Sequence, residues 1–192
     1  MTDRLWLRER LKSDEILIAP GVFEMISARV ADRHGFEALY MTGYGVVASY
    51  LGLPDAGIAS YTQMLDRVAQ IAGGTATPLI ADADTGYGAL LNIRETVRGY
   101  EAAGAVGIQI EDQEFPKKCG HTPNKRVVSI EEMTRRIQVA VESRRNEETL
   151  IIARTDARAV NGLDDALRRA EACAKAGADV LFVEAPTSEA EM

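Results

Sequence analysis

Three short stretches decide the fold of this sequence: RHGFEALYM (33–41), AAGAVGIQI (102–110) and KAGADVLFV (175–183). Each ends a segment of helical period, passes through the glycine at its third position and runs into a short apolar segment. Because glycine suits the left-handed position that ends a helix, each stretch predicts the same turn from a helix into a strand. The recurrence predicts a repeated β–α unit rather than a set of unrelated elements.

The apolar segments are nearly continuous rather than alternating, which is typical of strands buried on both faces of a parallel sheet. Six such segments occur, at residues 16–19, 38–41, 78–81, 107–110, 150–153 and 180–183. Amphipathic segments between them predict helices at 24–34, 62–71, 93–103, 129 to about 145, and 163–176. Ser129 and Glu132 have the spacing of a capping box, which predicts that the fourth of these helices begins there.

Repeated βα units form either a (β/α)8 barrel or a doubly wound open sheet. Polar side chains follow nearly every predicted strand: Thr42 and Tyr44, Asp82 and Asp84, Glu111 and Asp112, Arg154 and Asp156, and Glu184. A barrel gathers the carboxyl ends of all its strands around one mouth, whereas an open sheet binds ligands at one switch point. No Gly-x-Gly-x-x-Gly motif follows the first strand. The sequence therefore predicts an α/β fold of the (β/α)8 TIM-barrel type.

A full barrel has eight strands over roughly 250 residues. Only six strand segments are found in this chain of 192 residues, and the sixth lies close to Met192. We therefore expect one partial barrel domain over residues 1–192, truncated after about six βα units.

Composition excludes several classes of protein. The chain is 46% hydrophobic and 27% charged, as in ordinary globular proteins, and its net charge of −7 argues against nucleic-acid binding. Cys119 and Cys173 are too few for a disulfide framework. The N-terminus has no signal-peptide core, and no apolar run approaches the roughly 20 residues of a membrane helix. We expect a cytoplasmic protein that binds neither nucleic acid nor membrane.

Two carboxylates stand two positions apart in ADADTGYG (81–88). If the strand continues through both, Asp82 and Asp84 point the same way, and a cation would stabilise the paired negative charges. A hard ion with oxygen ligands, such as Mg²⁺, fits this chemistry. Glu111, after the next strand, could extend the metal shell through water. On spacing alone, the alternative is a solvated loop whose aspartates cap a helix.

The segment FPKKCGHTPN (115–124) is predicted to be a loop because of its prolines and glycine. Lys117, Lys118 and His121 flank Cys119, and a positive environment favours the reactive thiolate form. Such a thiol could move a proton to or from carbon. The alternative is an exposed cysteine among solvated lysines. No second ligand pair stands at zinc spacing.

Arg154 ends a predicted strand, where it could bind a carboxylate through two parallel hydrogen bonds. The alternative is an ion pair with a neighbouring Asp or Glu. Glu184 is a weaker candidate of the same kind. Cys173 lies on an apolar helical face and His34 at a helix C-terminus, so both are predicted to be structural.

Taken together, these residues resemble the isocitrate lyase/phosphoenolpyruvate mutase superfamily. The motifs that carry the resemblance, in the family's order and spacing, are LPDAGI (53–58), ADADTGYG (81–88), IQIEDQ (108–113), KKCGH (117–121) and ARTDA (153–157). KKCGH is the most specific and resembles the lyase branch, in which a cysteine is the catalytic acid/base. Phosphonate-forming mutases usually lack that cysteine. Within the lyases, the chain is most similar to 2-methylisocitrate lyase-like proteins.

The resemblance implies a role for each motif. Asp82 and Asp84 are expected to hold Mg²⁺, with Mn²⁺ as the alternative ion and with Asp55 and Glu111 as candidates for the outer shell. Cys119 is expected to transfer the proton. Substrate contacts are expected from Thr42, Gly43, Tyr44, Gly120, His121, Arg154 and Glu184, and Arg154 would also balance charge during catalysis.

The implied activity is that of a Mg²⁺-dependent carbon–carbon lyase. Its substrate would be a small 2-hydroxy di- or tricarboxylic acid resembling 2-methylisocitrate, cleaved to a 2-oxo acid (pyruvate or glyoxylate) and a carboxylate. Oxaloacetate decarboxylation or hydrolysis, and phosphonate mutation, are alternatives on the same scaffold. A third alternative is an inactive fragment that only binds ligand. Full-length family members form tetramers, so a homo-oligomer is expected.

Overall fold

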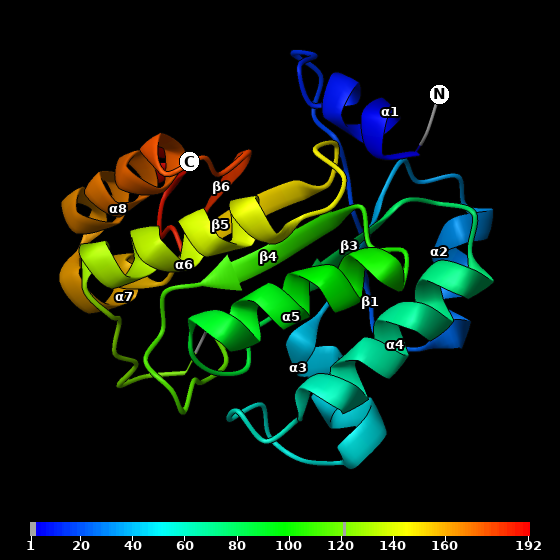
Figure 1. Cartoon of the computed structure of the whole chain (residues 1–192), viewed down its shortest axis with the longest axis horizontal. Coiled ribbons are helices and arrows are strands. Elements are labelled where there is room, and N and C mark those ends of the chain that lie inside the picture. Colours follow the sequence, from blue (N-terminus) through cyan, green and yellow to red (C-terminus); the bar gives the residue numbers. More distant parts are fainter. Residues whose placement is uncertain (1–2, 121) are drawn as a thin grey trace.

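Six parallel strands form one sheet in the computed structural model, which describes residues 3–120 and 122–192 (Figure 1). The strands are β1 (Gly21–Val22), β2 (Leu39–Met41), β3 (Leu79–Asp82), β4 (Gly107–Glu111), β5 (Leu150–Thr155) and β6 (Val180–Val183). Each strand pairs with the next one in the sequence. A doubly wound sheet reverses its strand order at a switch point. The unbroken order therefore confirms the barrel-type arrangement, here with six strands.

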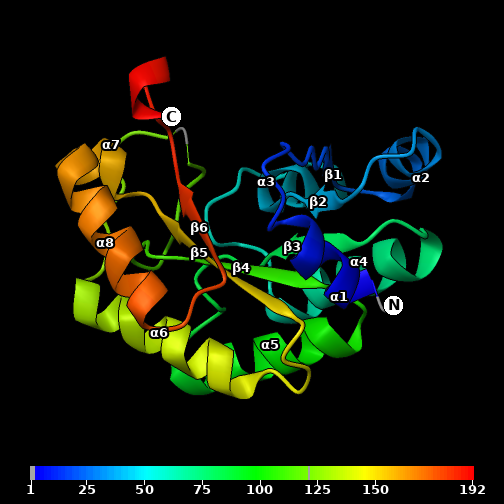
Figure 2. The same cartoon turned by 90° about the horizontal axis from the view of Figure 1, so that it is seen from above.

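Helices alternate with these strands and cover the outer side of the curved sheet (Figure 2). The five predicted helices are confirmed as α2 (Met25–Arg33), α4 (Tyr61–Gly74), α5 (Leu90–Ala102), α6 (Ile130–Ser143) and α8 (Leu163–Lys175). Shorter pieces are α3 (Gly43–Val46), a π-helical turn (Val47–Leu51), α7 (Ala157–Asn161) and a 3₁₀ turn (Glu189–Glu191). No helix in the described part of the chain is long and apolar enough to cross a membrane.

The three turn glycines have the backbone that the sequence predicts. Gly35, Gly104 and Gly177 have φ of 75°, 107° and 101°. After α5, the amide of Ala105 donates to the carbonyl of Tyr100 at 3.0 Å, which satisfies a carbonyl that the helix end leaves free. The same turn thus returns the chain from a helix to the sheet three times.

The first strand does not lie where the sequence predicts it. Residues 16–19 are not a strand, and Ile16 and Ile18 are 87% and 64% exposed. Pairing begins later, at Gly21, which lies opposite Tyr40 in the register. If that register is extended backwards, residues 16–19 lie opposite residues 35–38. Those residues form the turn before β2, so residues 16–19 have no strand to pair with.

Helix α6 begins as predicted, but its capping box is only half formed. The Ser129 hydroxyl accepts a hydrogen bond from the Glu132 amide at 3.1 Å. The Glu132 carboxylate instead pairs with Arg136 at 2.6 Å. The guanidinium of Arg136 is buried, and it donates hydrogen bonds to the carbonyls of Glu111 and Gln113 at 3.3 and 3.2 Å. The helix is thereby tied to the carboxyl end of β4.

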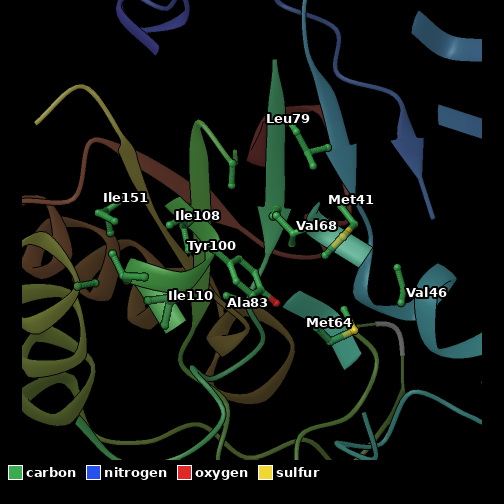
Figure 3. Close-up of a cluster of buried hydrophobic side chains, with 14 of the residues drawn as sticks. Met41, Val46, Met64, Val68, Leu79, Ala83, Tyr100, Ile108, Ile110 and Ile151 are labelled. Atoms are coloured by element: carbon green, nitrogen blue, oxygen red, sulfur yellow. The ribbon is translucent and has the colours of Figure 1, made fainter. Parts of the chain in front are cut away.

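Alternate residues of the strands build two hydrophobic clusters. Ile108 and Ile110 of β4 belong to the cluster between the sheet and its helices, with Met64 and Val68 of α4 (Figure 3). A second cluster on the inner side contains, among others, Ile80 and Ile152. Successive strand residues point to opposite faces, so the two clusters follow from the period of two.

Helix α1 (Asp3–Arg10), which the sequence analysis did not predict, covers the amino-terminal end of the inner cluster. Leu7 is fully buried there, and Trp6 packs beside it. The guanidinium of Arg8 lies 2.8 Å from Asp179 and donates to the carbonyl of Glu147 at 2.9 Å. Helix α1 therefore contacts segments that lie more than a hundred residues away in the sequence.

The turn between α5 and β4 yields a test of the fold. We expect Gly104→Ala to lower the free energy of unfolding by roughly 1–2 kcal/mol, because a side chain is strained at positive φ. The new Cβ would also lie 3.0 Å from the Cβ of Ala72. Gly73→Ala is the matched control, since Gly73 lies in α4 with open space around it. Urea unfolding should show the control unchanged or more stable; equal loss in both variants would contradict the argument.

Candidate active site

A cleft of about 300 Å³ opens at the carboxyl ends of the strands. The residues of the inner face continue into it with the period of two: Ile80 is followed by Asp82, and Ile152 by Arg154. The predicted site residues that line the cleft are Thr42, Gly43, Tyr44, Asp55, Asp82, Glu111, Cys119, Gly120, Arg154 and Glu184. Asp84 lies beside it, and His121 lies outside the described residues.

Four buried carboxylates gather at the ends of β3 and β4: Asp55, Asp82, Asp84 and Glu111. The ammonium group of Lys117 lies 2.5 Å from carboxylate oxygens of both Asp55 and Asp84. Burial raises the pKa of Asp84 to about 7; Lys117 opposes this shift and the charge of Asp82 adds to it. Burial also raises the pKa of Glu111 well above its usual value. The site thus holds more acidic groups than its buried cations balance.

The strand does not continue through both aspartates, so the condition for their pointing the same way is not met. Strand β3 ends at Asp82, and Asp84 has a left-handed backbone with φ of 49°. The Asp82 carboxylate accepts hydrogen bonds from the amides of Asp84 at 2.9 Å and Gly43 at 3.2 Å. A Cβ at position 43 would lie 2.7 Å from the Asp82 carboxylate, so glycine is required for this approach.

The donor set suits a hard cation. Within residues 3–120 and 122–192, no three His, Cys, Asp or Glu side chains converge closely enough to hold a metal ion directly. The carboxylate oxygens nevertheless match the preference of Mg²⁺, and Glu111 Oε1 is buried without a hydrogen-bond partner among the described residues. Mg²⁺ usually keeps several waters. The residues therefore fit a hydrated ion rather than a bare one.

Cys119 is partly exposed and lines the same cleft. Its amide donates to the carbonyl of Asp55 at 3.1 Å, which fixes the loop over the carboxylates. The lysines that precede it are engaged elsewhere: Lys117 by the carboxylates, and Lys118 by the carbonyl of Asn124 at 3.1 Å. Both ammonium groups thus have oxygen partners of their own, and their expected effect on the thiol stays a prediction.

Arg154 is held by neighbouring carboxylates. Its Nε and Nη2 donate to the two carboxylate oxygens of Asp156 at 3.0 and 3.1 Å. Glu111 and Glu184 lie at 3.5 Å from the same guanidinium. Although burial alone would lower it, Glu111 and Asp156 raise the pKa of Arg154 above its usual value. The structure therefore shows the alternative, an ion pair between Arg154 and Asp156. Asp156 binds Nε and Nη2, whereas Nη1 faces Glu111.

The remaining predicted contacts lie around the entrance. The Thr42 hydroxyl accepts a hydrogen bond from the Gly45 amide at 3.0 Å, so it caps α3 as well as lining the cleft. The Tyr44 side chain is 58% exposed. Gly120 lies against the ion pair: a Cβ there would be 2.5 Å from Arg154 Nη2 and 2.7 Å from Glu184 Oε1.

Sequence reasoning missed two residues of the site. Tyr40 lines the cleft, and burial followed by the charge of Asp82 raises its pKa well above the usual value, so its hydroxyl stays neutral. The signal was its position in β2 two residues before Thr42, because residues two apart in an extended chain point to the same side. Lys117 was assigned to the thiol. Its ion pairs with Asp55 and Asp84 join three separate segments of the chain, and a local sequence pattern cannot predict such contacts.

A family model described as phosphoenolpyruvate phosphomutase matches residues 7–192. The chain belongs to this family. The superfamily resemblance drawn from its motifs is thus confirmed, and with it the TIM-barrel type of fold.

Curated relatives of this phosphoenolpyruvate phosphomutase family member include two lyases. The 2,3-dimethylmalate lyase of Eubacterium barkeri is 48% identical over 97% of this chain and 64% of its own length. The 2-methylisocitrate lyase of Aeropyrum pernix is 46% identical over 96% of this chain and 59% of its own length. The chain therefore spans about three fifths of the length of these relatives.

Solved structures of the family extend the comparison. Oxaloacetate acetylhydrolase in complex with the inhibitor 3,3-difluorooxalacetate has a TM-score of 0.94 at 41% identity, covering 98% of this chain and 65% of that one. Phosphonopyruvate hydrolase in complex with oxalate and Mg²⁺ has a TM-score of 0.89 at 36% identity, covering 97% of this chain and 64% of that one. A crystal structure of 2,3-dimethylmalate lyase has the same TM-score of 0.94 at 40% identity, so the same fold occurs in a lyase and in these two hydrolases.

The two thiols of this family member should differ sharply in reactivity. Burial raises the pKa of Cys173 to about 11, so at pH 8 about one molecule in a thousand carries the thiolate there. A raised thiol pKa keeps the unreactive neutral form until the pH approaches that value. A disulfide reagent at pH 8 should therefore modify Cys119 rapidly and Cys173 slowly. Cys119→Ser should remove the fast phase and Cys173→Ala should keep it; two fast thiols would contradict this assignment.

Proposed function

We propose that the whole protein is a Mg²⁺-dependent carbon–carbon lyase. Its substrate would be a small 2-hydroxy di- or tricarboxylic acid resembling 2-methylisocitrate or 2,3-dimethylmalate, cleaved to a 2-oxo acid (pyruvate or glyoxylate) and a carboxylate. The observation that carries this proposal is one cleft that combines the Cys119 thiol, the Arg154 guanidinium and the carboxylates of Asp82 and Glu111. The 2,3-dimethylmalate lyase and the 2-methylisocitrate lyase described above support it.

Asp82 and Asp84 would hold Mg²⁺, or Mn²⁺ in its place, with Asp55 and Glu111 reaching it through water. The bound ion would lower the cost of negative charge on the substrate oxygens. The solved complex of phosphonopyruvate hydrolase with oxalate and Mg²⁺ supports this choice of ion. A carboxylate cluster with raised pKa values at Asp84 and Glu111 is the electrostatic setting that a cation would relieve.

Substrate contacts would come from both sides of the cleft. On one side, Thr42, Gly43 and Tyr44 would contact the carboxylate end, where α3 begins. On the other side are Gly120, His121, Arg154 and Glu184. A volume of about 300 Å³ suits a small acid rather than a polymer.

Cys119 would protonate the carbon released by cleavage. When the C–C bond breaks, its electron pair stays with the departing carboxylate fragment. The hydroxyl of the other fragment gives its proton to a carboxylate of the cleft and becomes the carbonyl of the 2-oxo acid. Cys119 gives its proton to that carbon, and Arg154 offsets the negative charge that develops. The loop at 115–124 would limit access of water to the reacting groups.

Attack of water on a 2-oxo acid, as in oxaloacetate hydrolysis, is the second candidate. The likeness to oxaloacetate acetylhydrolase, with a TM-score of 0.94 and 41% identity, supports it. A panel of dimethylmalate, methylisocitrate, oxaloacetate and phosphonopyruvate distinguishes the two by their products. A new 2-oxo acid from a hydroxy acid supports the lyase, whereas acetate and oxalate from oxaloacetate support the hydrolase. Phosphonate mutation, decarboxylation to pyruvate, or binding without turnover would overturn both.

Cys119→Ser tests the proton donor. We expect turnover of the hydroxy acid to fall by about 100-fold or more, because a serine hydroxyl is a far weaker acid than a thiol. Mg²⁺ binding, measured by calorimetry, should stay nearly unchanged. Cys173→Ala is the control, since Cys173 is buried away from the cleft. Turnover that survives Cys119→Ser would exclude the acid/base role.

Asp82→Ala tests the ion site. We expect metal-dependent turnover to be lost, because Asp82 is a proposed ligand and also orients Gly43 and Asp84. Asp82→Asn separates the two effects, since it keeps the size of the side chain and removes the charge. Asp164→Ala, at an exposed position of α8, is the control. A variant at position 82 that stays fully active after chelation of metal would refute the site.

The homo-oligomer and the cytoplasmic location stay predictions, as does the single partial barrel domain over residues 1–192. Gel filtration with light scattering on the whole protein would measure the oligomer.

A further inference from the structure

The loop that carries Cys119 is closed at its base. Two residues beyond the end of β4, Gln113 forms an isolated antiparallel bridge with Val127, where the loop returns. The Glu114 amide donates to the carbonyl of Arg126 at 2.9 Å, and the Val128 amide donates to that of Asp112 at 2.8 Å. The base is therefore fixed by backbone pairing.

Within this loop the Gln113 side chain crosses from the base to the backbone of Lys118. Its Nε2 donates to the Lys118 carbonyl at 2.8 Å, and its Oε1 accepts from the Lys118 amide at 3.0 Å. The side-chain amide thus makes the same two hydrogen bonds to the backbone of Lys118 that the backbone of a neighbouring strand would make. Gln113 is 1% exposed, so water does not compete for these bonds.

Gln113 is itself held in place from the other side. Its carbonyl accepts a hydrogen bond from Arg136 of α6 at 3.2 Å, and the same guanidinium nitrogen donates to the carbonyl of Glu111 at 3.3 Å. A continuous set of contacts therefore runs from α6 through the end of β4 to Lys118, the residue before Cys119.

The residues around the thiol are anchored to the cleft, whereas Gln113 is not part of it. The Cys119 amide donates to Asp55, and the Gly120 carbonyl accepts from Lys125. Gln113 is absent from the lining of the cleft, among the residues that the structure describes. It would therefore act on the chemistry only through the segment that it holds.

We propose that Gln113 is a positioning residue, whose side-chain amide fixes the backbone of Lys118 and thereby the direction in which Cys119 presents its thiol to the cleft. The importance of this for catalysis rests on the proposed function; the contact itself does not. Glutamine is required because it offers one donor and one acceptor at the same reach. An ionised glutamate offers two acceptors, and methionine offers neither strong donor nor strong acceptor.

Gln113→Met and Gln113→Glu test the proposal by the accessibility of the loop. We measure the alkylation rate of Cys119 with iodoacetamide, and tryptic cleavage after Lys117 and Lys118. Losing two buried hydrogen bonds should raise both rates by about tenfold or more. Gln138→Met and Gln138→Glu, at an exposed position of α6, are the matched controls. Thermal unfolding identifies any variant that fails to fold, and Gln113→Met avoids the buried charge of Gln113→Glu.

The kinetic readout separates positioning from a general loss of stability. In the whole protein, we expect kcat to fall by about tenfold or more, while the KM of the acid and the affinity for Mg²⁺ stay close to those of the parent protein. Rates of alkylation and cleavage in folded Gln113→Met that equal those of the parent would overturn the proposal. These two rates need no turnover, so they remain decisive if Cys119→Ser is active and the proposed function fails.

Discussion

The two-residue alternation of the β-strands is the constraint on which the whole site depends. One set of side chains packs against the helices, and the other fills the inner side of the curve. At the carboxyl ends of β3 and β5 the inner isoleucines give way to Asp82 and Arg154, and Glu111 ends β4 on the same side. A shift of register by one residue would turn these charges toward the helices and an isoleucine into the cleft. Packing of the core and assembly of the site are therefore a single requirement on the sequence.

Charge balance is the second organising feature, and it is incomplete. Lys117 and Arg154 are each surrounded by carboxylates, yet burial still raises the pKa values of Asp84 and Glu111. A buried acid that must take up a proton at neutral pH is a cost to the folded state, which natural proteins retain mainly at functional sites. In this cleft a divalent cation would serve the same purpose as those protons.

Much of the fold and the composition of the site could be predicted from local patterns, but not the contacts between segments. The glycine turns predicted the strands after them, because backbone freedom at Gly104 is a local property. The predicted position of the first strand was wrong, because a segment forms a strand only where a neighbouring strand lies opposite it. The direction of Asp84 stayed open in the sequence, because its spacing does not show that β3 ends two residues before it. The contacts of Lys117 join residues more than thirty positions apart, and spacing along the chain carries no record of them.

Helix α1 gives the molecule a built-in reporter of its own assembly. Its partners, Asp179 and the carbonyl of Glu147, come together only when β5 and β6 are in place. Contacts this distant in the sequence require a long loop to close, which costs chain entropy. Trp6, the single tryptophan of the sequence, packs in that helix against the inner cluster. Its fluorescence would therefore report the docking of α1 onto the inner cluster, without any engineered label.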